Sequence, residues 1–313
     1  MFSATAFHPI EAIAEEYVGM CNASAAVALD KNTFIVADDE DNILRIYDRN
    51  KRAPLQTVSL STIFPGEIED GKKLEIDLEG AATLGDKIFW IGSHSASKDG
   101  RYRPARHRLF ALQIKQVENG KFVASRVGKV YSKLLEDLEK DDRFKRYRIH
   151  RAKTIVSKDI GGVSIEGLAA TPAGGLLIGF RNPLSGGKGK ALLVTLLNPL
   201  EVIEGKQARF GNPTDLDLDH SGIRSIEFHK KDEYVIVAGD DNEHNKHKKS
   251  RIYLYSYPDK PRKIDINLDD FNAEAAFFYP QDDASVQLFS DDGSNCDVKN
   301  KRFRSRTECI ESH

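Results

Sequence analysis

The sequence predicts an all-β fold, most simply a β-propeller of five blades with four antiparallel strands each. Two observations carry this prediction. A short phrase built around Glu returns along the chain, and each copy is followed by a turn and further short apolar runs. Repetition of such four-strand units is typical of propellers, in which successive sheets surround a central channel.

The repeated phrase has a small polar residue, an apolar residue and then Glu, followed by an apolar run. It is clearest at residues 77–82 and 164–169, and a weaker first copy has Ser24 where Glu is expected. The four copies with a carboxylate place it at Glu79, Glu166, Glu227 and Glu274. One Glu from each of several repeats predicts a ring of carboxylates.

The runs after each copy are short, rich in β-branched and aromatic residues, and bounded by turn residues, so they predict strands in hairpins. The second runs cover residues 33–37, 88–91, 176–178, 234–237 and 286–289. Third runs open with a basic residue in four copies, and fourth strands are expected near residues 56–60, 121–124, 209–210 and 263–266. The last unit lacks a clear fourth strand, for which the segment around residues 11–18 is the candidate.

The gap between the second and third Glu copies is long, which leaves six blades open as an alternative. Its Leu residues at 134, 135 and 138 follow a helical spacing. We interpret residues 131–158, approximately, as a helical insertion in or after the second blade. We therefore expect one propeller domain over residues 1–313, with the N-terminal strand closing the last blade.

Composition and charge narrow the possible partners and location. The 46 Lys and Arg residues nearly balance 48 Asp and Glu residues, which predicts no nucleic-acid partner. Three cysteines without metal-ligand spacing favour a reducing compartment. The sequence has no secretory pattern at its start and no apolar stretch of membrane-spanning length. We expect a cytoplasmic protein without membrane association.

Polar residues are predicted to converge on one face of the disc. Because consecutive strands of a blade are antiparallel, the first strand's start, the second strand's end and the third strand's start share that face. The Glu residues occupy the first place. Residues at or near the second place are Asp39, His94, Arg181, Asp240 and Asp291, and those at the third are Arg45, Arg108, Lys190 and Arg251.

Two interpretations of the Glu ring stay open. A divalent cation, Ca²⁺ or Mg²⁺, relieves the repulsion among crowded carboxylates and prefers oxygen ligands. Alternatively, the carboxylates pair with basic side chains and lock neighbouring blades together, which also satisfies buried charge. His94 is likewise either a general acid or base or a hydrogen-bonded loop residue.

The Asp-x-Glu-Gly phrase at residues 77–80 and the Glu-Gly-Leu-Ala phrase at residues 166–169 resemble the propeller family that includes esterase-like phytases. They are most similar to a related bacterial domain family of unknown function with the same repeated phrases along nearly the whole chain. A more distant similarity is to calcium-activated nucleotidases, five-bladed propellers with a Glu from each blade around a central Ca²⁺. That resemblance implies metal ligation by the four repeated Glu residues, with Ser24 departing from the pattern.

Two functions follow from these patterns. The first is a metal-dependent phosphoric ester hydrolase acting on a small phosphoester at the channel mouth, with Ca²⁺ or Mg²⁺ as cofactor. Its expected metal ligands are Glu79, Glu166, Glu227 and Glu274, its catalytic residues His94 and Arg181, and its substrate-binding residues Arg108, Lys190, Arg251, Asp240 and Asp291. The second is a non-catalytic propeller that binds a protein or small ligand through its rim loops.

Overall fold

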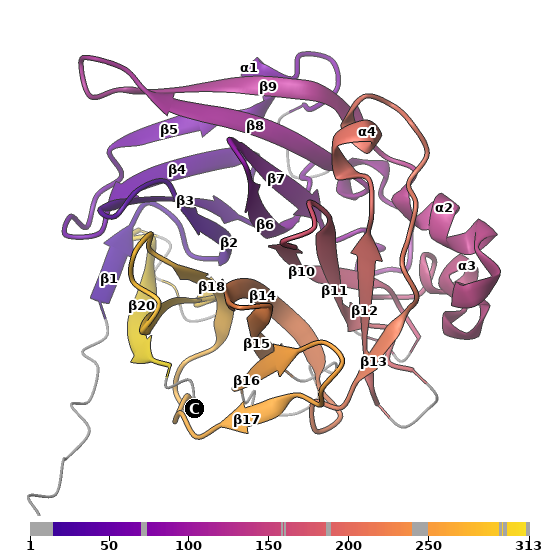
Figure 1. Cartoon of the computed structure of the whole chain (residues 1–313). Helices are drawn as coiled ribbons and strands as arrows, with labels where there is room; N and C mark the ends of the chain where they lie inside the picture. The colour runs from indigo at the N-terminus through magenta and orange to yellow at the C-terminus, as the bar shows by residue number, and fades with distance from the viewer. Residues whose placement is uncertain are drawn as a thin grey trace, which may run out of the picture.

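Five antiparallel sheets surround a central axis in the computed structural model (Figure 1). The structure describes residues 15–69, 74–157, 159, 161–185, 189–239, 250–293, 296 and 299–310. The innermost strands are β2, β6, β10, β14 and β18; each contacts the next around the axis, and the last contacts the first. The predicted five-bladed propeller is therefore confirmed, and the alternative of six blades is wrong.

Each of the first four blades is built from consecutive strands. Blade 1 contains β2 (Ala23–Ala28), β3 (Thr33–Asp38), β4 (Ile43–Asp48) and β5 (Gln56–Ser59). Blade 2 contains β6 (Leu78–Leu84), β7 (Lys87–Gly92), β8 (Leu109–Gln116) and β9 (Phe122–Tyr131). Blade 3 contains β10 (Ser164–Ala170), β11 (Leu176–Asn182), β12 (Ala191–Leu196) and β13 (Thr214–Leu216). Blade 4 contains β14 (Gly222–Lys230), β15 (Glu233–Gly239), β16 (Arg251–Ser256) and β17 (Arg262–Ile264).

Local hydrogen bonds explain why the chain turns where it does. In blade 1 the Asp30 carboxylate accepts the backbone N–H groups of Asn32 and Thr33 at 2.7 and 2.8 Å, and the Thr33 hydroxyl at 2.6 Å. These bonds satisfy backbone N–H groups that have no partner strand within the turn, and so they stabilise the reversal of chain direction between β2 and β3.

The core is divided among the blades. Five apolar clusters each fill the space between two neighbouring sheets, so no blade buries its apolar faces alone. The cluster between blades 5 and 1 is the most aromatic, with the Phe34 ring 4.9 Å from that of Phe289 and 5.3 Å from that of Tyr47. This packing fixes the sheets relative to one another and therefore fixes the residues that line the channel.

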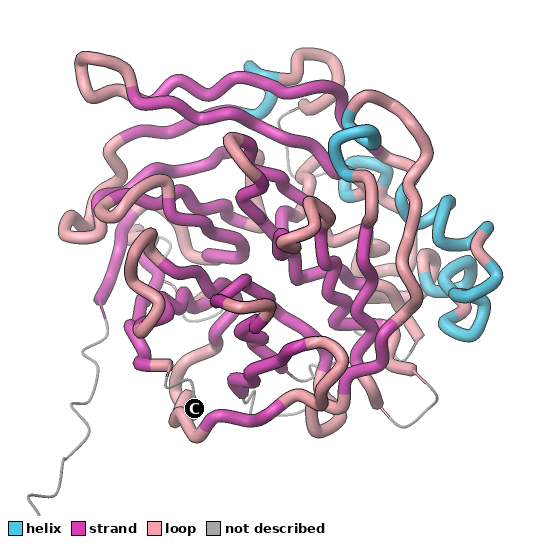
Figure 2. Tube along the Cα trace, in the orientation of Figure 1, coloured by secondary structure: helices cyan, strands magenta, loops and turns pink. Residues whose placement is uncertain are grey.

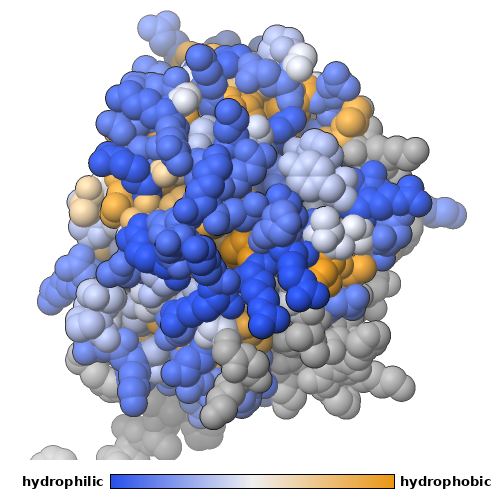
Figure 3. Space-filling model, turned by 90° about the vertical axis from the view of Figure 1, so that its right-hand side faces the viewer, coloured by the Kyte–Doolittle hydropathy of each residue, from blue (hydrophilic) through white to orange (hydrophobic). Residues whose placement is uncertain are grey.

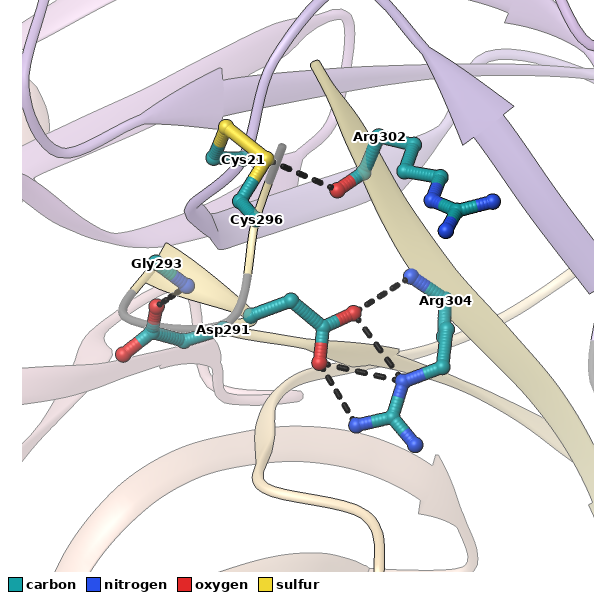
Figure 4. Close-up of a disulfide and its surroundings, with 7 residues drawn as sticks. Cys21, Asp291, Gly293, Cys296, Arg302 and Arg304 are labelled. Carbon is teal, nitrogen blue, oxygen red and sulfur yellow. Dashed lines mark hydrogen bonds and ion pairs between the residues drawn. A yellow bond between two sulfur atoms is a disulfide. The ribbon is translucent and has the colours of Figure 1, made fainter. Parts of the chain in front are cut away.

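Blade 5 combines both ends of the chain. It contains β18 (Ala273–Phe278), β19 (Ser285–Ser290), β20 (Arg302–Cys309) and β1 (Glu15–Val18), with β1 antiparallel to β20. Beside this junction Cys21 and Cys296, 275 residues apart in sequence, form a disulfide with a Cα–Cα distance of 5.7 Å (Figure 4). The disulfide does not fit the expectation of reduced cysteines, and only Cys309 is free.

Helices are confined to connections at the edge of the disc (Figure 2). They are α1 (Leu60–Ile63), α2 (Leu134–Lys140), α3 (Ile149–Ala152), α4 (Pro199–Ile203) and the 3-10 turns at Pro104–Arg106 and Asp142–Tyr147. The expected helical insertion after blade 2 is thus present, and it packs on the cluster between blades 2 and 3. The side of the molecule shown in Figure 3 is mostly hydrophilic, with hydrophobic residues in small separate areas. Within the described part of the chain, no helix is both long and apolar enough to cross a membrane.

Candidate functional site

A β-bulge occurs at the same place in every innermost strand. The pairing register with the second strand shifts by one residue there, which leaves one inner residue without a partner across the ladder. The five bulge residues are Ser24, Glu79, Glu166, Arg224 and Glu274. Each blade therefore contributes one residue to a ring at one mouth of the channel.

The fourth member of this ring is Arg224, so the expected position of Glu227 at this mouth is wrong. In β14 the register shift lies between Ile223 and Ser225, whereas Glu227 pairs regularly with Val235 further along the strand. Three residues of extended chain separate Arg224 from Glu227 by roughly 10 Å along the channel. Glu227 instead lines a cavity at the opposite mouth.

Arg224 joins two carboxylates of the ring. Its guanidinium forms an ion pair with Glu274 and lies 3.4 Å from a carboxylate oxygen of Glu166. Glu166 also accepts hydrogen bonds from Arg181 at 3.0 Å and from the Ser164 hydroxyl at 3.1 Å. Burial opposes ionisation of Glu166, but the nearby charges of Arg181 and Arg224 outweigh it and lower the pKa of Glu166. This half of the ring is a buried ion-pair network that links blades 3, 4 and 5.

The other half of the mouth is acidic. Carboxylate oxygens of Asp39, Asp77 and Glu79 all lie within 4.8 Å of one another. Burial, followed by repulsion from neighbouring carboxylates, raises the pKa values of Asp39 and Glu79 well above their usual range. The pKa of Asp77 is also raised by burial, although Arg106, Ser93 and Ser95 oppose this. We call these three residues the acidic cluster.

Side chains from blade 2 hold Asp77 in place. Its carboxylate accepts hydrogen bonds from the hydroxyls of Ser93 and Ser95, the latter at 3.2 Å, and lies 2.9 Å from the guanidinium of Arg106. Arg106 also bonds Glu75 at 2.7 Å. Asp77 itself has a φ of 58°, an uncommon backbone conformation at the start of the repeated phrase. Asp77 is therefore positioned by specific contacts within blade 2.

The acidic cluster has room for one more bond. Oxygen Oδ1 of Asp39 is buried and has no hydrogen-bond partner among the described residues. Burial is the main cause of the raised pKa of Asp39, followed by the charges of Asp77 and Asp38. Asp291 of blade 5 raises it further, so it adds negative charge to the same region. Three oxygen donors with an unsatisfied lone pair fit Ca²⁺ or Mg²⁺ better than Zn²⁺, which prefers His or Cys ligands.

His94 points away from the ring. It is fully buried with φ 54°, its Nδ1 donates to the Gly92 carbonyl at 2.8 Å, and its ring centroid is 5.1 Å from that of His107. Burial, followed by the nearby charge of Arg108, lowers the pKa of His94 to about 4, so its imidazole is uncharged at neutral pH. The charges that act on it include no carboxylate of the ring.

The four expected third-strand cations are not among the bulge residues of the ring. Arg45 pairs with Asp41 at 2.7 Å. Arg108 lines a separate cavity of about 270 Å³ with Glu67 and Ile76. Lys190 is exposed, and Arg251 donates to the Ser221 hydroxyl at 2.9 Å. Asp240 lies outside the described residues.

The structure thus brings together five of the residues selected from the sequence as site residues: Glu79, Glu166, Glu274, Arg181 and Asp291. The ring and the acidic cluster also contain or contact Arg224, Asp77 and Arg106, which are not among the site residues expected from the sequence. Asp77 belongs to the repeated phrase itself, and aligning the bulge positions instead of the Glu residues identifies Arg224.

The fold and the site define a class of protein: a five-bladed propeller in which one mouth of the channel carries both acidic and basic side chains. Within that class the chain belongs to a family described as "Protein of unknown function (DUF3616)", whose model matches residues 22–127 and 105–246. This confirms the expected similarity to a family of unknown function, whereas nothing found relates the chain to phytases or nucleotidases. No curated protein matches it in sequence.

Solved structures resemble the chain in fold alone. Glutaminyl cyclase of Myxococcus xanthus is 12% identical, with a TM-score of 0.44 over 96% of this chain and 98% of that chain. The PQQ-bound aldose sugar dehydrogenase of Streptomyces coelicolor is 10% identical, with a TM-score of 0.46 over 96% and 99% of the two chains. Virginiamycin B lyase of Staphylococcus aureus is 8% identical, with a TM-score of 0.39 over 96% and 100%. The function must therefore be argued from the site.

Proposed function

We propose that this protein is a divalent-metal-dependent hydrolase of small phosphoesters, with its reaction centre at the channel mouth that carries the ring. The observation that carries the proposal is the convergence of Asp39, Asp77 and Glu79 within 4.8 Å. Three half-buried carboxylates at this spacing repel one another when ionised, and a divalent cation would remove the repulsion.

The acidic cluster would hold Ca²⁺ or Mg²⁺ through carboxylate oxygens. When bound, such a cation polarises a phosphoryl oxygen and lowers the pKa of a water molecule. This ligand set replaces the four-Glu set expected from sequence, because Glu166 and Glu274 already pair with arginines.

Positive charge for a phosphoester is available next to the cluster. Arg106 pairs with Asp77 at 2.9 Å and with Glu75 at 2.7 Å, and its side chain keeps an exposed fraction of 18% through which a ligand could reach it. Arg181 and Arg224 are more deeply buried and are bound to ring carboxylates. We assign the binding of phosphoester oxygens to Arg106 and the orientation of Glu166 to the two buried arginines.

Proton transfer requires a carboxylate that stays ionised near the cluster. Glu166 meets this need, because Arg181 and Arg224 hold its pKa low despite burial. It is also the charge that acts most strongly on Glu79. Glu166 would therefore orient the attacking water and accept its proton, a role that His94, which faces away from the ring, does not fit.

The test is hydrolysis of a panel of small phosphoesters by wild type, Glu79→Gln and Glu118→Gln, each with added Ca²⁺ or Mg²⁺ after chelation. Glu118 is exposed in a hairpin of blade 2 and serves as the control. We expect cation-dependent turnover in wild type and the control, and a loss of about 10²-fold or more in Glu79→Gln. Turnover in Glu79→Gln equal to wild type, or no turnover by wild type with any phosphoester, contradicts the proposal.

A further inference from the structure

The opposite mouth of the channel contains a second cavity, which the proposed function does not use. It measures about 310 Å³ and is bordered by the far ends of β2, β6, β14 and β18 and by the turn after β18. A volume near 300 Å³ suits a small molecule. Among its lining residues are Thr83, Glu227, Phe228, Phe277, Phe278 and Tyr279.

Glu227 is the only carboxylate on an innermost strand in this lining, and it has no partner. Among the described residues, no cation or hydrogen-bond donor contacts its side chain. Burial alone raises the pKa of Glu227 to about 8, with no neighbouring charge to offset it. A carboxylate in this position without a counter-ion costs stability unless a ligand or a proton neutralises it.

The rest of the lining combines aromatic rings and two carboxylates with small apolar and neutral polar residues, among them Val27, Ala28 and Gln281. Asp282 and Asp283 add carboxylates at the turn, and neither Lys nor Arg is among the described lining residues. Lys230 lies near but bonds Asp283 at 3.1 Å. His229 is held by Glu233 at 2.9 Å and by the Asp283 carbonyl at 2.6 Å, and it stacks on Phe278 with centroids 4.7 Å apart.

The geometry points to a binding site for a small organic ammonium ion in this cavity, with Glu227 as its counter-ion and the aromatic rings around its alkyl part. A carboxylate supplies the charge, and aromatic faces attract cations through their quadrupole. A phosphate or carboxylate ligand is disfavoured, because Glu227 has no counter-ion and the nearby cations are already engaged. Lys230 pairs with Asp283, and the Arg49 guanidinium lies over the Tyr279 ring, 4.0 Å from its centroid.

The site is independent of the ring, and its ligand is not the phosphoester of the proposed function. Glu227 lies roughly three residues of extended strand from Arg224 and experiences no charge from the ring carboxylates. Binding here can therefore succeed or fail whatever the outcome at the acidic cluster.

The test is a calorimetric titration of the full chain with n-butylammonium chloride at about pH 8, where Glu227 is substantially ionised. The neutral isostere n-butanol and sodium chloride at matched ionic strength are the ligand controls. We expect saturable binding of butylammonium only, with affinity roughly tenfold or more weaker in Glu227→Gln and unchanged in Glu118→Gln. Equal binding of butanol, no binding of butylammonium, or unchanged affinity in Glu227→Gln overturns the proposal.

A second variant keeps the test independent of how Glu227→Gln folds. Thr83 is exposed on the β6 side of the cavity, so Thr83→Lys places an ammonium group in the same space without disturbing the core. We expect this built-in cation to compete with butylammonium and weaken its binding at least as much as Glu227→Gln does. Wild-type affinity in Thr83→Lys contradicts the site.

Discussion

Replacing Arg224 by Met removes the cation that joins two buried carboxylates of the ring. Arg224, Glu166 and Glu274 are only 5, 5 and 7% exposed, so water cannot replace the lost charge. Glu166 retains Arg181 at 3.0 Å, whereas Glu274 loses the ion pair that satisfies it. Breaking a buried pair from one side typically costs about 3–5 kcal/mol, and we expect a loss of about 3 kcal/mol near neutral pH because one of the two carboxylates stays paired.

The loss should depend on pH in a defined direction. In wild type the pKa of Glu166 is lower in the folded state than in the unfolded chain. Its ionised form therefore stabilises the fold at pH values above the unfolded pKa, and this contribution is lost as the pH falls through the folded pKa. In Arg224→Met both carboxylates lose a cation, so their folded pKa values rise and the folded state takes up protons. The difference between wild type and variant should therefore grow as pH rises from about 4.5 toward 8.

Urea unfolding followed by Trp90 fluorescence measures this directly, because the chain has one Trp and it is fully buried in β7. Arg52→Met is the matched control, since it breaks the exposed Arg52–Glu16 pair of 2.7 Å and should cost no more than about 1 kcal/mol. In the Arg224→Met background, Glu274→Gln should recover part of the loss by removing the unpaired charge. An Arg224→Met cost no greater than that of Arg52→Met, or one that does not change with pH, refutes the buried network.

Three further predictions concern other parts of the molecule. The pKa of Glu227 is about 8 in the folded state, against an ordinary value of 4.5. The free energy of unfolding of wild type should therefore fall by at most about 1.4 kcal/mol per pH unit between these two values. Urea unfolding should show that Glu227→Gln lacks this slope. Gly222→Ala would bring a Cβ into collision with the Arg181 carbonyl oxygen, so thermal unfolding should show a loss of about 1–3 kcal/mol in the free energy of unfolding. Replacing Cys21 and Cys296 by Ser opens a loop of 275 residues and should cost about 2–5 kcal/mol, with no further loss on adding reductant.

The architecture was predictable because it depends on repetition. Short apolar runs between turn residues recur in every blade, and each run needs the next sheet to cover its apolar face. The same logic identifies the helical insertion, whose Leu residues pack on the cluster between blades 2 and 3. The disulfide was not predictable, because nothing local relates Cys21 to Cys296 until the ring closes.

The site was predictable only in part, because a repeated phrase does not reveal its bulges. In blade 4 the phrase matches at Ser225 to Glu227, but the bulge lies at Arg224, three residues before the Glu position that it occupies in blades 2, 3 and 5. That shift exchanges a carboxylate for a guanidinium and moves Glu227 to the other mouth. Similarly, the end of β7 predicts the place of His94 in the chain but not its positive φ, which turns its ring toward His107.

Binding of a divalent cation by the acidic cluster is the step on which the proposed function depends. The most direct measurement is the melting temperature after exhaustive chelation, with Ca²⁺, Mg²⁺, Mn²⁺ or Zn²⁺ added to wild type, Glu79→Gln and Glu118→Gln. A cation that binds only the folded state stabilises it by RT ln(1 + [L]/Kd), about 2.7 kcal/mol at a hundredfold excess over Kd. We expect the melting temperature of wild type and Glu118→Gln to rise with the concentration of Ca²⁺ or Mg²⁺, and that of Glu79→Gln not to rise. No rise with any cation, or an equal rise in Glu79→Gln, would contradict it.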